Sequence, residues 1–335
     1  MAKEDSKCWA KWLDGKIVRD VLPGGMVVHT VRGDEGVLDA LERLAEKKVL
    51  SLPVYDVVKK EYNALVDLPD LLTLAVVTMK CKGVAEAFRG SEIPWKEYLA
   101  KELEMLRGVT VAEVVGAASA LKTAGGPVRC EDRNPWCPIW EEYPLHSLLD
   151  IFGREVNIHR VPVIDGNGEM VAIVSQSRIV DFLVENLAAL GEARHARPAA
   201  RPITDAVRSV DASAPLVDAY AALLESGYSG VAVVDDKGAL AGALSASDLR
   251  ILGYDIALLL QSMSGTVAEF QRAHKPKTAE LVQNCTIQQN ATVEEILRKF
   301  HENKVHRLFC VGDDGVPTGV VSLCDVISTV HDVSL

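Results

Sequence analysis

The most constraining feature of this 335-residue chain is a repeat that occurs four times with one internal length. In segments 158–181 and 305–328, a His-Arg pair, an apolar strand, a polar turn, a second apolar strand, a serine and a helix start align without a gap. The distance from His159 to Arg178 is 19 residues, as is that from His306 to Asp325. The same spacing recurs from residue 229 to 248 and from 51 to 70. One internal length in four copies predicts four small units of one architecture.

Each copy follows a segment with the periodicity of an amphipathic helix of about three turns. These segments are residues 37–48, 144–156, 216–227 and 293–304. Before the last of them, Thr292 and Glu295 predict a capping box. Each unit is therefore expected to run helix, strand, turn, strand, helix, which is an α/β (α+β) arrangement. So small a unit buries too little surface alone, and we expect the units to pair.

Composition suggests the domain boundaries. The Ala/Arg/Pro-rich segment 191–202 predicts a linker between two pairs of units. The other predicted parts are an N-terminal tail (1–15), unit one (16–107), unit two (108–190), unit three (203–262) and unit four (263–335). The Gly- and Pro-containing segment 116–138 predicts an exposed loop in unit two. The tryptophans at the end of this loop either fold back onto the core or contact a partner.

Charge and cysteine content limit the partners. The chain has 36 Lys and Arg against 47 Asp and Glu, a net charge of −11, which argues against nucleic acid or an anionic membrane as a partner. Seven cysteines without CxxC spacing indicate a reducing compartment. The N-terminus lacks the apolar stretch of a secretory signal, and the apolar runs are too short to cross a bilayer. We therefore expect a cytoplasmic protein.

Ligand chemistry is expected where the second strand of a unit meets the following helix. In GVVSLCD (319–325), the Ser322 hydroxyl can cap the helix or donate to a phosphate, and Asp325 can accept two ribose hydroxyls. The alternative is a serine cap and a first-turn acid with no ligand, but the repeated spacing favours the ligand. The candidate ribose-binding carboxylates are Asp248, Asp325 and, in a weakened site, Asp70. The candidate phosphate-binding hydroxyls are Ser175, Ser245 and Ser322.

Two His-Arg pairs open the first strands of units two and four. If these units occupy equivalent places, the pairs His159-Arg160 and His306-Arg307 could converge into one cationic patch that grips phosphates. The alternative is that each histidine is satisfied locally at its strand end. The sequence contains no Ser-His-Asp elbow, HExxH, P-loop or GxGxxG motif. We therefore expect no enzyme, no metal site and no catalytic cofactor.

The pattern Gly, apolar, apolar, Ser, two variable residues and Asp resembles the ligand motif of CBS modules. Four such modules over about residues 16–331 resemble the gamma regulatory subunit of AMP-activated protein kinase and its plant and fungal relatives. The series at the ribose position, Asp70, Arg178, Asp248 and Asp325, is similar to that of animal gamma subunits. The resemblance implies two pairs of modules in a flat disc around a phosphate-facing cavity where AMP, ADP or ATP exchange. It also implies a kinase catalytic subunit and a beta-type scaffold subunit as partners, in the cytoplasm and the nucleus.

Module one departs from this pattern. It has Asp67 where a hydroxyl belongs and Ala64 where glycine belongs, so we expect its site to be weakened or lost. Module two lacks a ribose carboxylate and is expected to stand empty, with Arg178 directed at the phosphate of a neighbouring site. The sites of Asp248 and Asp325 are the ones expected to bind. Two functions remain open: a subunit that senses adenylates for a kinase, and a stand-alone CBS scaffold with partly decayed sites.

Overall fold

The computed structural model describes residues 9–81, 104–115, 135–197, 207–275 and 278–333. These residues form four three-stranded sheets, one in each repeat. In every sheet a short first strand pairs in parallel with the second, and the second pairs antiparallel with the third. The predicted α+β class and the four-fold repeat are confirmed. Most of the predicted loop 116–138 lies outside the described residues.

The first two modules follow the predicted order of helix, strand, turn, strand, helix. Module one consists of β1 (Val31–Arg32), α2 (Val37–Lys47), β2 (Ser51–Asp56), β3 (Glu61–Asp67) and α3 (Leu68–Cys81). Module two consists of β4 (Ile139–Trp140), α7 (Leu145–Arg154), β5 (Arg160–Ile164), β6 (Met170–Ser175) and α8 (Gln176–Glu185), followed by the 3-10 helix η2 (Leu187–His195). In α2 the residues Val37, Ala40, Leu41 and Leu44 form one buried stripe, as the helical period requires.

The last two modules repeat this order. Module three consists of β7 (Ser209–Asp211), α9 (Leu216–Glu225), β8 (Gly230–Val234), β9 (Leu240–Ser245) and the 3-10 helix η3 (Ala246–Arg250), followed by α10 (Ile256–Ser262) and α11 (Val267–His274). Module four consists of α12 (Thr278–Cys285), β10 (Thr286–Ile287), α13 (Val293–Asn303), β11 (Arg307–Val311), β12 (Pro317–Ser322) and α14 (Leu323–Asp332). The predicted capping box is confirmed: Thr292 Oγ1 accepts from the Glu295 N–H, and Glu295 Oε2 accepts from the Thr292 N–H.

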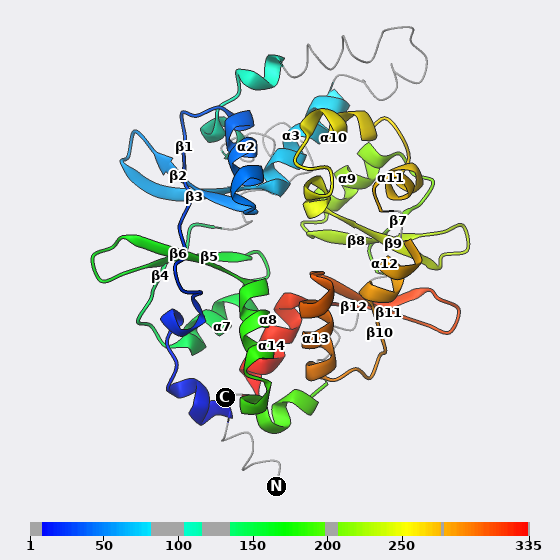
Figure 1. Ribbon diagram of the computed structural model, residues 1–335. Helices are drawn as coiled ribbons and strands as arrows, with labels where there is room; N and C mark the ends of the chain where they lie inside the picture. Colours follow the sequence, from blue (N-terminus) through cyan, green and yellow to red (C-terminus); the bar gives the residue numbers. More distant parts are fainter. Residues whose placement is uncertain (1–8, 82–103, 116–134, 198–206, 276–277, 334–335) are drawn as a thin grey trace, which may run out of the picture.

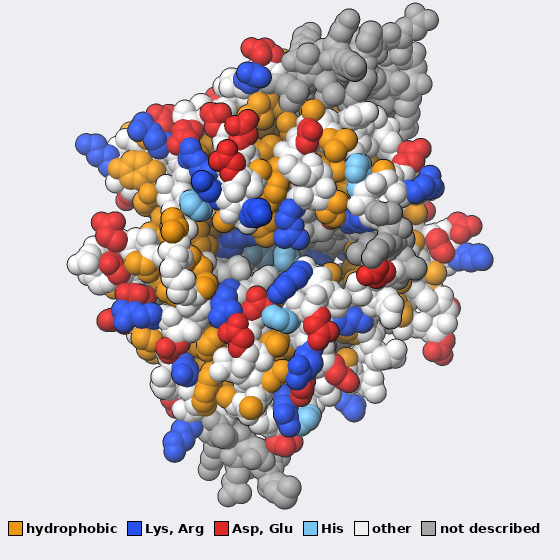
Figure 2. Space-filling model, in the orientation of Figure 1, with side chains coloured by type: hydrophobic (Ala, Val, Ile, Leu, Met, Phe, Trp, Pro, Cys, Tyr) orange, Lys and Arg blue, Asp and Glu red, His pale blue; other side chains and the backbone are white. Residues whose placement is uncertain are grey.

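The four modules lie around a common centre (Figure 1). The sheets of modules one and two lie side by side on one half of this ring, and those of modules three and four on the other half. One hydrophobic core joins the helices of modules one and three, and a second joins those of modules two and four. Each module therefore contacts one neighbour through its sheet and another through its helices. The centre of the ring is hollowed, with Lys and Arg side chains around it (Figure 2).

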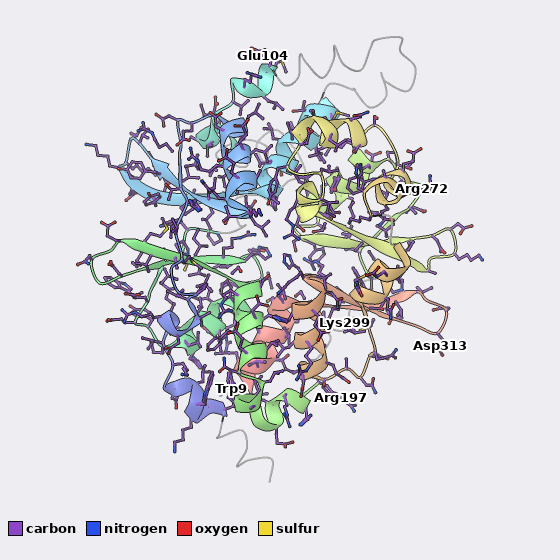
Figure 3. All side chains as sticks on the ribbon, viewed as in Figure 1. Trp9, Glu104, Arg197, Arg272, Lys299 and Asp313 are labelled. Atoms are coloured by element: carbon purple, nitrogen blue, oxygen red, sulfur yellow. The ribbon has the colours of Figure 1, made fainter. Side chains whose placement is uncertain are left out.

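The two helix layers are closely packed. Where α7 crosses α14, a Cβ placed on Gly153 would lie 2.9 Å from the Cα of Ser328, so the crossing requires glycine at this position. The hairpin turns of the modules point away from the centre, and Asp313 lies at the tip of the last one (Figure 3). Within the described ranges, no helix combines the length and the apolar character needed to cross a membrane.

Part of the segment 1–15, expected to be a tail, belongs to the fold. The side chains of Trp9 and Leu13 are buried in the core of modules two and four, and Trp9 Nε1 donates to the Val330 carbonyl at 3.1 Å. The 3-10 helix η1 (Val18–Val21) lies against α7 and α8. The predicted linker 191–202 likewise begins inside η2, which is packed on the same core. The core of modules two and four removes Trp9 and Leu13 of the first segment and Ala193 of the second from water.

Candidate functional site

A cavity of about 930 Å³ lies at the centre of the ring and is lined by all four modules. Its walls are the ends of the third strands, the first turns of the following helices and the starts of the second strands. This geometry follows from the antiparallel hairpin, because its register sets the first residue of the second strand opposite the last residue of the third. The cross-strand pairs are Ser51 with Asp67, Arg160 with Ser175, Gly230 with Ser245 and Arg307 with Ser322.

Cationic side chains outnumber carboxylates in this cavity. Its basic lining residues are Arg160, Arg208, Arg250, Lys304 and Arg307, and its acidic ones are Asp67, Asp181 and Asp325. With the three lining histidines neutral, the cavity carries a net charge of about +2 in a chain of −11. A cavity of this size that concentrates positive charge can take a small organic anion.

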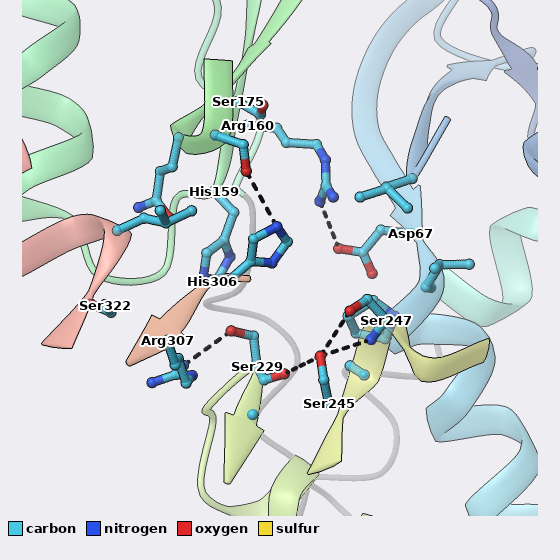
Figure 4. A pocket seen from close by; sticks show the side chains of 18 of the residues that line it. Asp67, His159, Arg160, Ser175, Ser229, Ser245, Ser247, His306, Arg307 and Ser322 are labelled. Atoms are coloured by element: carbon cyan, nitrogen blue, oxygen red, sulfur yellow. Dashed lines mark hydrogen bonds and ion pairs between the residues drawn. The ribbon is translucent and has the colours of Figure 1, made fainter. Parts of the chain in front are cut away.

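The structure brings most of the predicted site residues together. The cavity is lined by His159, Arg160, Ser175, Ser245, His306, Arg307, Ser322 and Asp325 (Figure 4). The predicted convergence of the two His-Arg pairs is therefore observed in this structure. Three predicted residues are not among the lining residues: Asp70, Arg178 and Asp248.

Module four presents Ser322 and Asp325 as expected from their spacing. The Ser322 hydroxyl lies 2.6 Å from Asp325 Oδ2, and the Ser322 N–H donates to the same oxygen at 2.8 Å. The Ser322 hydroxyl in turn accepts from the Asp325 N–H at 3.4 Å, which completes a capping box. The capping role, considered as the alternative to ligand binding, is thus realised, but the same two side chains face the cavity.

Arg307 is the most deeply buried cation of the cavity wall. Its Nη2 donates to the Ser229 hydroxyl at 3.0 Å, and its guanidinium lies 5.3 Å from the centre of the Tyr228 ring. Among the described residues, Arg307 Nε has no hydrogen-bond partner. Burial lowers the pKa of the guanidinium below its usual value, although it stays charged at neutral pH. A buried cation whose Nε has no hydrogen-bond partner among the described residues is poised to accept an anion.

Beside Arg307, the His306 imidazole is neutral at pH 7. Burial is the main reason that its pKa is lowered to about 4. The guanidinium groups of Arg160, Arg250 and Arg307 lower this pKa further. Its Nε2 lies 3.2 Å from the Ser177 hydroxyl. His306 therefore offers one donor and one acceptor, rather than a positive charge, to the cavity.

On the other half of the ring, Arg160 reaches from module two to Asp67 of module one. Arg160 Nη1 lies 3.6 Å from Asp67 Oδ2, and the Asp67 side chain is only 3% exposed. Asp67 also begins α3: its Oδ1 accepts from the Asp70 N–H, and Asp70 Oδ2 accepts from the Asp67 N–H at 2.8 Å. Asp70 therefore closes a helix cap and does not line the cavity. The expectation that Asp67 weakens the first site gains a structural basis, because its carboxylate faces a cation expected to hold phosphate.

Asp248, expected to lead the third site, faces away from the cavity. Its carboxylate accepts from Lys275 Nζ at 2.7 Å and from the Ser245 N–H at 3.0 Å, and both charged side chains are less than 10% exposed. The lysine also donates to the Ala243 carbonyl at 2.9 Å. In this structure, therefore, Lys275 holds the carboxylate expected to bind ribose. Lys275 lies outside the repeat, so the internal spacing carried no sign of this contact.

Arg178 also lies elsewhere than expected. Its two Nη atoms donate to Glu185 at 2.9 and 3.1 Å, and its Nε donates to the Val21 carbonyl at 2.8 Å. The expected direction toward a phosphate in the cavity is thus wrong for this conformation. Glu185 is seven positions along the same helix, two turns away, and gives the guanidinium a bidentate partner.

The repeat alignment did not single out several lining residues. Arg208, Arg250 and His29 line the cavity, but none of them is a His-Arg, serine or ribose-position residue of the repeat. For Lys304 the sequence does contain a repeated feature. Lys304 follows the end of α13 in the left-handed conformation, and Lys48 follows the end of α2 in the same conformation in module one. In both modules this lysine precedes the second strand. Whether its side chain lines the cavity depends on how the modules pack against one another.

Comparisons with known proteins agree with this architecture. The CBS domain model matches residues 137–185, 200–253 and 279–332, which lie in modules two, three and four. The gamma subunit of 5'-AMP-activated protein kinase from Kluyveromyces lactis is 24% identical over 326 residues, which are 94% of this chain and 89% of that protein. The counterpart from Saccharomyces cerevisiae is 24% identical over 323 residues, covering 95% and 90% of the two chains.

The fold comparison covers all four modules. The crystal structure of protein MJ1225 from Methanocaldococcus jannaschii, a proposed archaeal homologue of g-AMPK, superposes with a TM-score of 0.60 at 14% identity, over 93% of this chain and 99% of that one. At this identity the likeness shows the fold alone. Module one, which the family model does not match, has the same strand order as the other three. Three segments of the chain thus match the CBS domain model, and the chain is similar over most of its length to gamma subunits of AMP-activated protein kinase.

Proposed function

We propose that this chain is an adenine-nucleotide-binding regulatory subunit, in which AMP, ADP and ATP compete for the central cavity and their occupancy controls a protein kinase complex. The observation that carries the proposal is the cavity of net positive charge, with the buried Arg307 beside the first turn of α14. The relatives that align over most of the chain are, by name, gamma subunits of a 5'-AMP-activated protein kinase. In this function the chain is not itself an enzyme.

Module four has the groups that an adenylate requires. Arg307 and His306 can donate hydrogen bonds to phosphate oxygens, and the N-terminus of α14 adds a favourable dipole. The Asp325 carboxylate can accept hydrogen bonds from ribose hydroxyls, since it lines the cavity one helical turn from Ser322. A monophosphate carries nearly two negative charges, which would offset the net positive charge of the cavity.

Occupancy can reach a partner because the cavity belongs to all four modules. A ligand that binds Arg307 and Asp325 changes the electrostatic balance between the two halves of the ring, so it favours one relative placement of the modules. We expect the partners to be a kinase catalytic subunit and a beta-type scaffold subunit, in the cytoplasm and the nucleus. Purification of the native complex followed by mass spectrometry tests this partner assignment.

Calorimetric titration of the full chain with AMP, ADP and ATP tests the nucleotide assignment. We expect each nucleotide to bind and to compete with the others, and Asp325→Ala to weaken AMP binding at least about tenfold, because hydrogen bonds to a charged acceptor are lost. Asp313→Ala is the matched control, since this carboxylate is exposed at the tip of the β11–β12 hairpin, away from the cavity. Absence of binding to the folded wild-type chain would refute the proposal.

A second function is favoured by two internal ion pairs. Asp248 is held by Lys275, and Arg160 lies against Asp67, so two groups expected to bind nucleotide have partners within the chain. These pairs are what a stand-alone CBS scaffold with decayed sites would contain. Equal nucleotide binding, or equal lack of binding, by wild type and Asp325→Ala would favour the scaffold.

A further inference from the structure

One position has a different chemical character in module one from that in the other three modules. The last residue of the third strand is serine in modules two, three and four, as Ser175, Ser245 and Ser322, and it is Asp67 in module one. All four side chains line the same cavity. Three hydroxyls and one carboxylate therefore stand at equivalent places around one space.

Two arginines of the cavity wall meet partners of different charge. Arg307 of module four extends toward module three, where it meets the neutral Ser229 hydroxyl at 3.0 Å. Arg160 of module two extends toward module one, where it meets the Asp67 carboxylate at 3.6 Å. Arg160 thus meets a carboxylate at the end of a third strand, whereas Arg307 meets a hydroxyl on the residue that precedes a second strand.

We propose, on the basis of the nucleotide-binding function above, that Asp67 is an internal counter-anion that sets the charge selectivity of the cavity. Its carboxylate stands at Arg160 where the distal phosphates of a polyphosphate would bind. The half with Arg307 then takes one phosphate group, and the cavity discriminates in favour of AMP and against ATP. Asp67 is a specificity-determining residue because it withdraws one cation and presents a negative charge to any further phosphate.

The charges and dimensions support this assignment. Arg307 and Arg160 line one continuous cavity, so the phosphate chain of a nucleotide held at Arg307 can extend toward Arg160. The Asp67 side chain is 3% exposed and that of Arg160 is 16% exposed, so solvent screens little of their interaction. In such surroundings a carboxylate repels each added phosphate charge by an amount that corresponds to about tenfold or more in affinity.

The competing explanation is that Asp67 only begins α3. It does cap that helix, because its Oδ1 accepts from the Asp70 N–H. Serine is an equally good N-cap and is the residue that the other three modules use. Asp67→Ser therefore keeps the cap and removes the charge. A purely structural role predicts no change in nucleotide selectivity for this variant.

The test compares wild type, Asp67→Ser and Asp67→Ser/Arg160→Met, each as the full chain. Calorimetry measures the ratio of ATP to AMP affinity, and inorganic tripolyphosphate serves as a probe without a nucleoside. We expect Asp67→Ser to raise this ratio at least about tenfold and to raise tripolyphosphate affinity similarly. The added Arg160→Met should remove the gain. Asp313→Ser changes the net charge by the same amount at the tip of the β11–β12 hairpin and should change neither quantity.

The outcomes separate this inference from the proposed function. If wild type binds adenylates and Asp67→Ser leaves the ATP to AMP ratio unchanged, the nucleotide function stands and the role of Asp67 is refuted. If neither protein binds any adenylate, the proposed function is refuted. Tripolyphosphate then decides the role of Asp67: a gain only in Asp67→Ser supports it, and an equal response of both proteins overturns it.

Discussion

The imidazole of His306 links the cavity to the pH dependence of stability. Its pKa is about 4 in the folded chain and about 6.5 when exposed. Below pH 6.5 the unfolded chain therefore binds a proton at this residue that the folded chain does not bind, so stability falls as pH falls toward 4. Below pH 4 both states are protonated and the loss is complete. At 1.36 kcal/mol for each pKa unit, the full loss is about 3 kcal/mol, of which about 2 kcal/mol has occurred at pH 5.

Urea unfolding at pH 7, 6 and 5 measures this effect when wild type is compared with His306→Gln. Glutamine keeps a hydrogen-bonding group near the Ser177 hydroxyl but does not titrate. Other titrating groups, such as the buried His331, are present in both proteins and cancel in the comparison. We expect wild type to lose about 2 kcal/mol more than the variant between pH 7 and pH 5. Parallel pH dependence of the two proteins would refute a buried neutral imidazole.

The same group predicts proton uptake when a nucleotide binds. A phosphate beside the three guanidinium groups near His306 would offset their repulsion of the imidazolium, so the pKa of His306 rises toward its usual value. Near pH 5, AMP binding should then take up a fraction of a proton. Calorimetry in two buffers of different ionisation enthalpy detects this uptake. Uptake of the same size in His306→Gln would assign it to another group.

Three further predictions concern buried contacts. Arg307→Met removes a buried cation, so we expect the free energy of unfolding measured in urea to be unchanged or raised by up to about 2 kcal/mol. Calorimetry should show AMP affinity reduced at least about tenfold. A large loss of stability would contradict this prediction. Lys275→Met leaves the Asp248 carboxylate buried without its cation. In urea titrations this should cost about 3–5 kcal/mol, most of it recovered by adding Asp248→Asn. Gly153→Ala forces α7 away from Ser328. Thermal unfolding should show a loss of about 1–3 kcal/mol in the free energy of unfolding. An unchanged unfolding temperature would mean that α7 and α14 can move apart at little cost.

The local architecture could be predicted because it repeats. Modules two, three and four share one hairpin register, whereas module one pairs Ser51 with Asp67, one residue further apart in the sequence. The placement of Ser322 and Asp325 at a strand-to-helix junction followed from the sequence, as did the Thr292 cap. Convergence of the two His-Arg pairs followed from the equivalence of modules two and four. Each of these inferences uses information contained within one repeat or in the comparison of two.

The contacts between repeats could not be predicted in this way. Arg160 and Asp67 are 93 positions apart, and their meeting depends on how the sheets of two modules pack. Lys275 reaches Asp248 from outside the repeat. Within α8, Arg178 pairs with Glu185 and not with a group in the cavity. Which ion pair a charged side chain forms depends on which charged groups the tertiary structure brings near it.

The electrostatics of the cavity give a reason for the difference in charge between the repeats. Exact repetition would direct several like charges into one small space, and their repulsion would oppose folding. The chain relieves this repulsion in three ways: Asp67 faces Arg160, His306 stays neutral, and Arg307 lies over the Tyr228 ring. The contact with Asp67 makes Arg160 less available to a ligand, whereas His306 and Arg307 keep their hydrogen-bond donors directed at the cavity. Repulsion that remains near Arg307 lowers the stability of the folded chain and is offset when an anion binds. AMP should therefore raise the unfolding temperature of wild type more than that of Arg307→Met.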